Sequence, residues 1–214
     1  GFEYNVGRHR EHKALEMVTD KLSQVVSQNP KQASTTMSAL LGDTAQKAMV
    51  AKVVHEMVAD IAEHKRAYGN TLAVGVINDE VVDKLSKMGK APHHSIIAVR
   101  DDDILHGLRD SKQALGKDLN MEFWQNLPTE LQNPTAILLQ TKEQQRQKSA
   151  LDTLVFVYKN SNGKVLVKVD YAVKIKENNG EKKQVKLNMV KTGSTLSDDE
   201  LSSLKSFDLL WGKL

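Results

Sequence analysis

Three residues between positions 103 and 112 have the types and spacing of a phosphate-cleaving site. In a helix, His106, Arg109 and Lys112 follow one another at intervals of three, so they line roughly the same side. An imidazole exchanges a proton near neutral pH, and Arg and Lys stabilise a phosphorane-like transition state. The segment therefore predicts acid–base chemistry on a phosphate ester. An ordinary solvated helix face with one surface histidine would show the same spacing.

A second group of polar residues gathers at the end of a predicted strand: Asn188, Lys191, Thr192 and Ser194, with a glycine at position 193. Side chains at a strand end often face a cleft, so these residues are candidates for contacting a substrate. Any exposed strand terminus contains such residues too.

No metal site and no cofactor are expected. The pair His55–Glu56 begins like a zinc-protease motif, but position 59, where the second histidine belongs, is Ala59. His93 and His94 would point to opposite faces of an extended strand and could not share one ion. The acidic run 101–103 lacks the spacing and glycine of a calcium loop and is typical of a helix start. The chain has no cysteine and no glycine-rich phosphate-binding loop.

Positive charge is concentrated in one part of the chain. Residues 142–191 hold 12 Lys or Arg and 5 Asp or Glu, which gives this stretch about +7 within a chain of net charge +3. Clustered positive charge attracts phosphate whatever the base sequence, so the stretch is a candidate polyanion-binding surface. Solvated lysines that protect edge strands from pairing with other chains are the alternative.

The elements that would position these residues are predicted to form an α+β fold. Residues 1–13 are polar and are interpreted as a linker or arm. Apolar residues recur every three or four positions over 13–28 and 34–68, which predicts a helical hairpin as a connector over residues 14–70. A change of composition after Gly69 places a boundary there, ahead of a domain spanning 71–214.

The domain over 71–214 is expected to contain a four-stranded antiparallel meander. Its strand candidates are 135–140, 153–159, 164–175 and 184–192. Asn and Gly between the last three candidates favour tight hairpins. The meander is expected to pack against the helix that carries His106. Further elements are expected as strands at 72–77 and 95–100, helices at 79–88 and from 101, and a short helix from 197.

The chain is expected to be soluble, without a membrane partner. No apolar run approaches the ~20 residues needed to cross a bilayer, and the first residues lack the pattern of a signal peptide. Because it begins at Gly1 without an initiator methionine, we also expect it to be a segment of a longer protein.

The stretch from about 95 to 195 resembles the phage-associated nuclease domains of the barnase/EndoU/colicin/RelE-like type. The resemblance rests on Ser-Ile-Ile-Ala-Val-Arg, Ile-Leu-His-Gly-Leu-Arg-Asp, Asn-Pro-Thr-Ala-Ile-Leu, Leu-Val-Phe-Val-Tyr and Leu-Asn-Met-Val-Lys-Thr, and covers about half the chain. Residues 1–7, Gly-Phe-Glu-Tyr-Asn-Val-Gly, are similar to a segment that ends the phage Mu F-like minor head protein module. This copy has Val6 where proline is usual.

The resemblance implies metal-independent endoribonuclease activity, in which a 2′-hydroxyl attacks the adjacent phosphorus and leaves a 2′,3′-cyclic phosphate. His106 would match the helix histidine that acts as general acid or base. Arg109 would match the arginine that clamps a phosphate, and Thr192 would match a polar catalytic position near the last strand's end. Lys112 and Lys191 are additional candidates from spacing alone.

We therefore expect the C-terminal part of a phage or prophage minor head (head morphogenesis) protein, located in the virion or the host cytoplasm. Its expected partners are RNA, with tRNA as one candidate, and capsid or portal proteins. A non-catalytic capsid or portal interaction module is the alternative. A toxin domain with a cognate immunity protein is a third.

Overall fold

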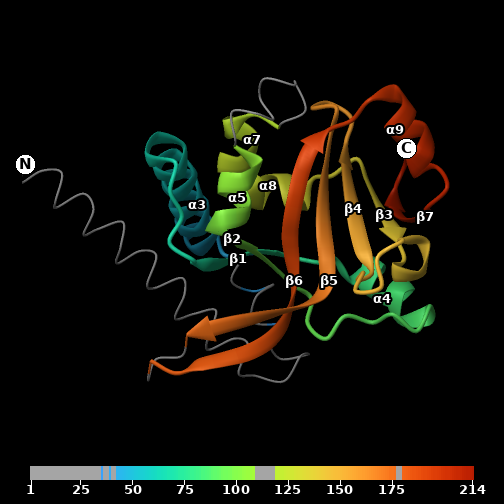
Figure 1. Cartoon of the computed structure of the whole chain (residues 1–214), viewed down its shortest axis with the longest axis horizontal. Helices are drawn as coiled ribbons and strands as arrows, with labels where there is room; N and C mark the ends of the chain where they lie inside the picture. Colours follow the sequence, from blue (N-terminus) through green and yellow to red (C-terminus); the bar gives the residue numbers. More distant parts are fainter. Residues whose placement is uncertain (1–34, 36–38, 40–41, 109–118, 177–179) are drawn as a thin grey trace, which may run out of the picture.

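The computed structural model describes residues 35, 39, 42–108, 119–176 and 180–214, and they build an α+β fold around one mixed sheet (Figure 1). The α+β class predicted from the sequence is confirmed. The strands are β1 (Thr71–Val76), β2 (Ile96–Arg100), β3 (Ala136–Gln140), β4 (Thr153–Tyr158), β5 (Gly163–Lys176), β6 (Lys182–Thr195) and β7 (Asp208–Gly212). The described helices are α3 (Thr44–His64), α4 (Asp79–Lys87), α5 (Asp101–Gly107), α7 (Met121–Gln125), α8 (Leu127–Gln132), α9 (Asp198–Leu204) and the 3₁₀ helix η1 (Lys142–Gln144).

The sheet is larger than the predicted four strands. Its order is β1-β2-β6-β5-β4-β3-β7. The strands β3 to β6 are antiparallel neighbours in chain order, but β2 pairs in parallel with β6, and β7 pairs antiparallel with β3. Both edges of a four-stranded sheet would leave backbone N–H and C=O groups unpaired, and the added strands satisfy them. The prediction of a sheet with four strands was therefore wrong in extent.

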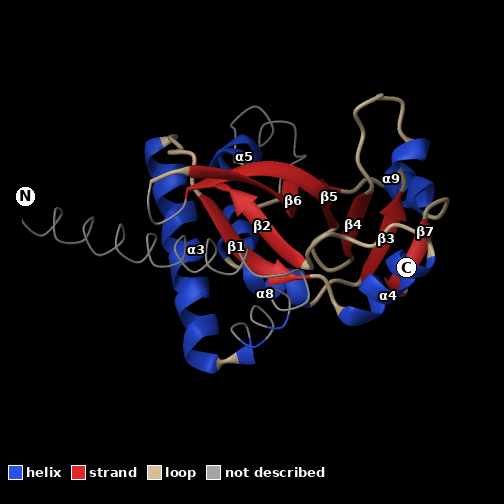
Figure 2. Ribbon diagram, turned by 90° about the horizontal axis from the view of Figure 1, so that it is seen from below, coloured by secondary structure: helices blue, strands red, loops and turns tan. Residues whose placement is uncertain are grey.

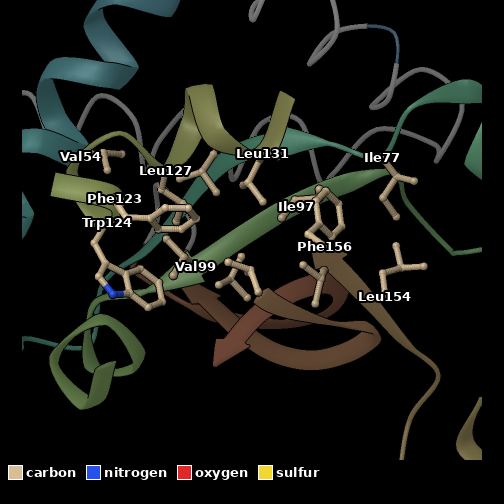
Figure 3. Packing of buried hydrophobic residues seen from close by; sticks show 14 of the residues in the cluster. Val54, Ile77, Ile97, Val99, Phe123, Trp124, Leu127, Leu131, Leu154 and Phe156 are labelled. Atoms are coloured by element: carbon tan, nitrogen blue, oxygen red, sulfur yellow. The ribbon is translucent and has the colours of Figure 1, made fainter. Parts of the chain in front are cut away.

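The large core lies on one face of this sheet. Figure 3 shows Phe123 and Trp124 of α7 with Leu127 and Leu131 of α8, beside Ile97 and Val99 of β2 and Phe156 of β4. β2 is apolar at four successive positions and all four are buried, as expected for a strand in the interior of a sheet.

The other face of the sheet has its own apolar clusters. Alternation along β4 separates the two faces, because Leu154 belongs to the large core whereas Val155 belongs to a smaller cluster with Leu204 of α9. Figure 2 shows α3 beside β1 and β2 at one end of the sheet, and α9 near β3 and β7 at the other. None of the helices within the described ranges has both the length and the apolar character needed to cross a membrane.

The predicted helical hairpin can be judged only for its second helix. The predicted helix over 13–28 lies outside the described residues. The predicted helix over 34–68 is present as α3 and ends at His64. Its buried residues, among them Val54 and Val58, share the large core with Trp124. The helical segment thus packs onto the sheet domain across the predicted boundary at residue 70.

Candidate functional site

The helix that carries His106 follows β2 without a loop. Arg100 ends the strand and Asp101 begins α5. Asp101 is 2% exposed, and its carboxylate accepts hydrogen bonds from the backbone N–H groups of Tyr68, Gly69 and Asn70, at 2.9, 3.1 and 3.1 Å. This carboxylate therefore fixes α5 to the turn before β1, a structural task that agrees with the interpretation of 101–103 as a helix start.

An ion pair joins α5 to β6. The Nζ of Lys191 donates to Oδ2 of Asp103 at 3.0 Å, and both side chains are less than one-fifth exposed. The same Nζ lies 4.5 Å from the ring centroid of Tyr171 on β5, a cation–π distance. Burial raises the pKa of the Asp103 carboxyl, and the hydrogen bond from Lys191 offsets part of that rise. Lys191 is thus a positioned cation beside the first turn of α5.

The backbones of α5 and β6 also approach one indole ring. A Cβ on Gly107 would lie 2.9 Å from Cζ2 of Trp124, and a Cβ on Gly193 would lie 2.7 Å from the same atom. Both positions therefore require glycine for close contact with this ring. The indole is 1% exposed and its Nε1 has no hydrogen-bond partner. Trp124 thus brings the residues next to Gly107 and Gly193, including His106, into one region.

His106 is exposed on α5, one turn after Asp103. Residues three apart on a helix lie on neighbouring parts of its surface, so His106 lies on the side that contacts Lys191. Lys191 is therefore ion-paired one helical turn before His106, and the approach of the two side chains to each other stays a prediction. Arg109 and Lys112, the other predicted residues of this helix, lie outside the described residues.

Thr192 and Ser194 follow a bulge in β6. Lys191 is an extra residue between the paired positions Val167↔Val190 and Leu166↔Thr192. Such a bulge shifts the alternation of side chains along the strand. Gly193 consequently meets Trp124, and Thr192 lies opposite Leu166, which packs in the cluster under α9. Thr192 also neighbours Gly193, which meets the same indole ring as Gly107, so the expected convergence of Thr192 with His106 stays a prediction.

Ser194 belongs to the face under α9 as well. It pairs in register with Lys164, whose Nζ lies 3.1 Å from Oε2 of Glu200 on α9. The Ser194 side chain is therefore placed near α9 and not near α5.

Asn188 lies inside the protein. Its side chain is 0% exposed, and its Nδ2 donates to the carbonyl oxygens of His94 at 2.6 Å and Ile96 at 2.9 Å. Its Oδ1 accepts from the backbone N–H of Asp170 at 3.3 Å. The amide thus joins β6 to the start of β2 and to a bulge in β5, and it has no surface that a substrate could reach.

The two adjacent histidines lie closer together than expected. His93 and His94 precede β2 in an irregular segment, so the strand alternation that would separate them does not apply. Their ring centroids are 4.8 Å apart. His94 is 5% exposed with no partner for Nδ1, and burial lowers the pKa of its imidazole. This pair lies at the opposite end of β2 from α5. Among the described residues, no group of three His, Asp or Glu side chains is arranged to hold a metal ion.

Comparison with known family models, curated proteins and solved structures found no match to this chain. The resemblance to phage-associated nuclease domains therefore remains a prediction.

Sequence reasoning had missed three residues of this region. Asp103 and Tyr171 contact Lys191, and Trp124 lies against Gly107 and Gly193, but each looked like an ordinary helix-start, core or sheet residue. The one available signal was the spacing of Asp103, one helical turn before His106.

Proposed function

We propose that this chain is an endoribonuclease-like domain that cleaves RNA without a metal ion, with His106 as the group that transfers a proton. The observation that carries the proposal is the Lys191–Asp103 ion pair, which holds a cation of β6 against the helix face that bears His106. A titratable imidazole one helical turn from a positioned ammonium group would suit proton transfer and charge stabilisation at one phosphate.

The reaction would need only groups of the RNA and the protein. The 2′-oxygen of a ribose forms a bond to the adjacent phosphorus while the bond to the 5′-oxygen breaks. One proton leaves the 2′-hydroxyl and one is delivered to the 5′-oxygen, so the products are a 2′,3′-cyclic phosphate and a 5′-hydroxyl. His106 would take or deliver one of these protons, and Lys191 would offset the charge that develops on the phosphate.

The remaining roles follow the resemblance and are part of the proposal. Arg109 would clamp the phosphate and Lys112 would contact the RNA. Thr192, which adjoins Gly193, would be the polar group from the strand end. In its wider context, the chain would belong to a phage minor head protein and meet capsid or portal proteins in the virion, or RNA in the host cytoplasm.

A binding module without catalysis is the second candidate. The basic stretch 142–191 favours it, since clustered positive charge attracts phosphate without any catalytic group. Such a domain would bind RNA or a capsid protein and leave it intact.

Cleavage of a labelled single-stranded RNA in the presence of EDTA separates the two candidates. Loss of one general acid or base costs about 10²–10⁴-fold in rate, so His106→Ala should nearly abolish cleavage. His55, an exposed histidine on α3, provides the matched control, and His55→Ala should cleave like the wild type. An intact RNA with the wild-type chain, or equal rates for wild type and His106→Ala, would exclude the proposed site.

A further inference from the structure

The ends of β5 and β6 form a two-stranded arm beyond the rest of the sheet. β4 pairs with β5 only as far as Lys168, and β2 pairs with β6 only over 188–190. The two strands continue together over 171–176 and 182–187, and Figure 1 shows this arm extending away from the other strands. The arm is therefore a separate surface of the molecule, defined here by these two ranges.

The two faces of the arm differ in chemistry. Val173 and Val185 lie opposite each other and are buried in a cluster with Ala73 and Ile96. The alternate positions carry exposed lysines: Lys174, Lys182 and Lys186. The apolar face fixes the register of the arm, and the register in turn fixes which lysines share the exposed face.

The three exposed lysines form a compact group. Lys174 lies opposite Gln184, so Lys182 and Lys186 are its two diagonal neighbours on the partner strand. Such neighbours are about 7–8 Å apart. The ranges 171–176 and 182–187 contain no Asp or Glu, and no ion pair to these three lysines is present within the described part of the chain. Their mutual repulsion is unfavourable in the free protein, and a polyanion would relieve it.

The lysine face lies on the side of β6 that faces the large core, whereas the Nζ of Lys191 lies over Tyr171, which packs on the apolar face of the arm. Lys186, Asn188 and Val190 alternate along β6 without a bulge, and Val190 lies in the large core with Ile104 of α5.

We propose that the lysine face of the arm binds the phosphate backbone of single-stranded RNA. This inference rests on the proposed function for its choice of RNA. The contact would be independent of base sequence, because ammonium groups on flexible stems recognise phosphate charge and no base edge. Each phosphate neutralised releases counterions, so binding should weaken steeply as salt is added.

The test is the salt dependence of binding of a 2′-O-methyl RNA, which has no free 2′-hydroxyl and cannot be cleaved by the proposed reaction. The arm variant is Lys174→Gln, Lys182→Gln and Lys186→Gln together. The control is Lys148→Gln, Lys159→Gln and Lys213→Gln, three exposed lysines outside the arm with the same total change of charge. Fluorescence anisotropy would be recorded over a range of salt concentrations.

The arm variant should bind more weakly, and the slope of log affinity against log salt should shrink by about 2, at about 0.7 per lost phosphate contact. The control should keep nearly the wild-type slope. Equal slopes for the two variants, or no RNA binding by the wild type, would overturn the inference. A variant that aggregates while a soluble fraction binds like the wild type would also overturn it, because the lysines would then only protect the strand edges.

The two proposals fail in different ways. Arm-dependent binding without cleavage of ordinary RNA would reject the ribonuclease and support the arm. Cleavage that depends on His106, with a salt slope unaffected by the arm variant, would reject the arm and support the ribonuclease.

Discussion

Lys191 on β6 and Asp103 on α5 form an ion pair of 3.0 Å that connects the end of the sheet to the helix carrying His106. Both groups are more than four-fifths covered, so solvent screens the pair less than it screens a surface ion pair. The pair exists because a bulge places Lys191 out of the regular alternation of β6. The geometry of the proposed site therefore depends on one irregular residue.

We predict that Lys191 and Asp103 are energetically coupled. Lys191→Met leaves the Asp103 carboxylate mostly buried without its partner, which should cost about 1–3 kcal/mol of unfolding free energy. In a double-mutant cycle with Asp103→Asn, measured by urea unfolding, the coupling should be about 0.5–3 kcal/mol. If the changes in unfolding free energy of the two single substitutions simply add in the double variant, the pair contributes nothing to holding α5.

Asn188→Ala is predicted to affect stability and to leave RNA binding unchanged. The substitution leaves the carbonyl groups of His94 and Ile96 without their buried donor, at about 1–3 kcal/mol for each group that stays unsatisfied. The midpoint of urea unfolding should fall, while the affinity of the folded protein for 2′-O-methyl RNA should match the wild type. The reverse pattern, normal stability with lost RNA binding, would restore Asn188 as a substrate contact.

Several features were predictable because their causes are local. The strands β5 and β6 follow from alternation and from Asn and Gly in the turn between them, and α9 follows from its cap, Ser197, which accepts a hydrogen bond from the N–H of Glu200. The parallel pairing of β2 with β6 and the position of β7 depend on contacts between distant segments. No local pattern in the sequence encodes them.

The candidate site, too, was predictable only where its cause is local. His106 and Lys191 could be proposed from residue type and spacing, but the bulge at Lys191 could not be predicted, because no local pattern marks the extra residue that shifts the alternation of β6. The contact between His93 and His94 was missed because they lie in an irregular segment, where no periodicity applies.

His94 is predicted to make the folded protein sensitive to mild acid. Burial lowers the pKa of its imidazole below the ordinary value of about 6.5, and His93 and Asp170 are the titratable groups that face it. The unfolded chain then binds the proton more tightly than the folded chain. The free energy of unfolding should therefore fall as the pH drops below about 6.5 and continue to fall through the lower pKa of the folded state.

The variant His94→Gln isolates this contribution. The difference in unfolding free energy between about pH 8 and about pH 5 should be smaller in the variant than in the wild type. Urea unfolding at both pH values measures it, and a shared contribution from His93 and Asp170 cancels in the comparison. Identical pH dependence in the two proteins would mean that His94 does not bind a proton on unfolding.

The most direct measurement of the central claim is the chemical end group that the protein leaves on RNA. Wild type, His106→Ala and His55→Ala would each be incubated with a single-stranded RNA in the presence of EDTA. The masses of the products would then be measured by mass spectrometry. The account predicts fragments ending in a 2′,3′-cyclic phosphate and a 5′-hydroxyl for wild type and His55→Ala, and about 10²–10⁴-fold slower formation for His106→Ala. Intact RNA with the wild type, or the same cyclic products at the same rate from His106→Ala, would contradict it.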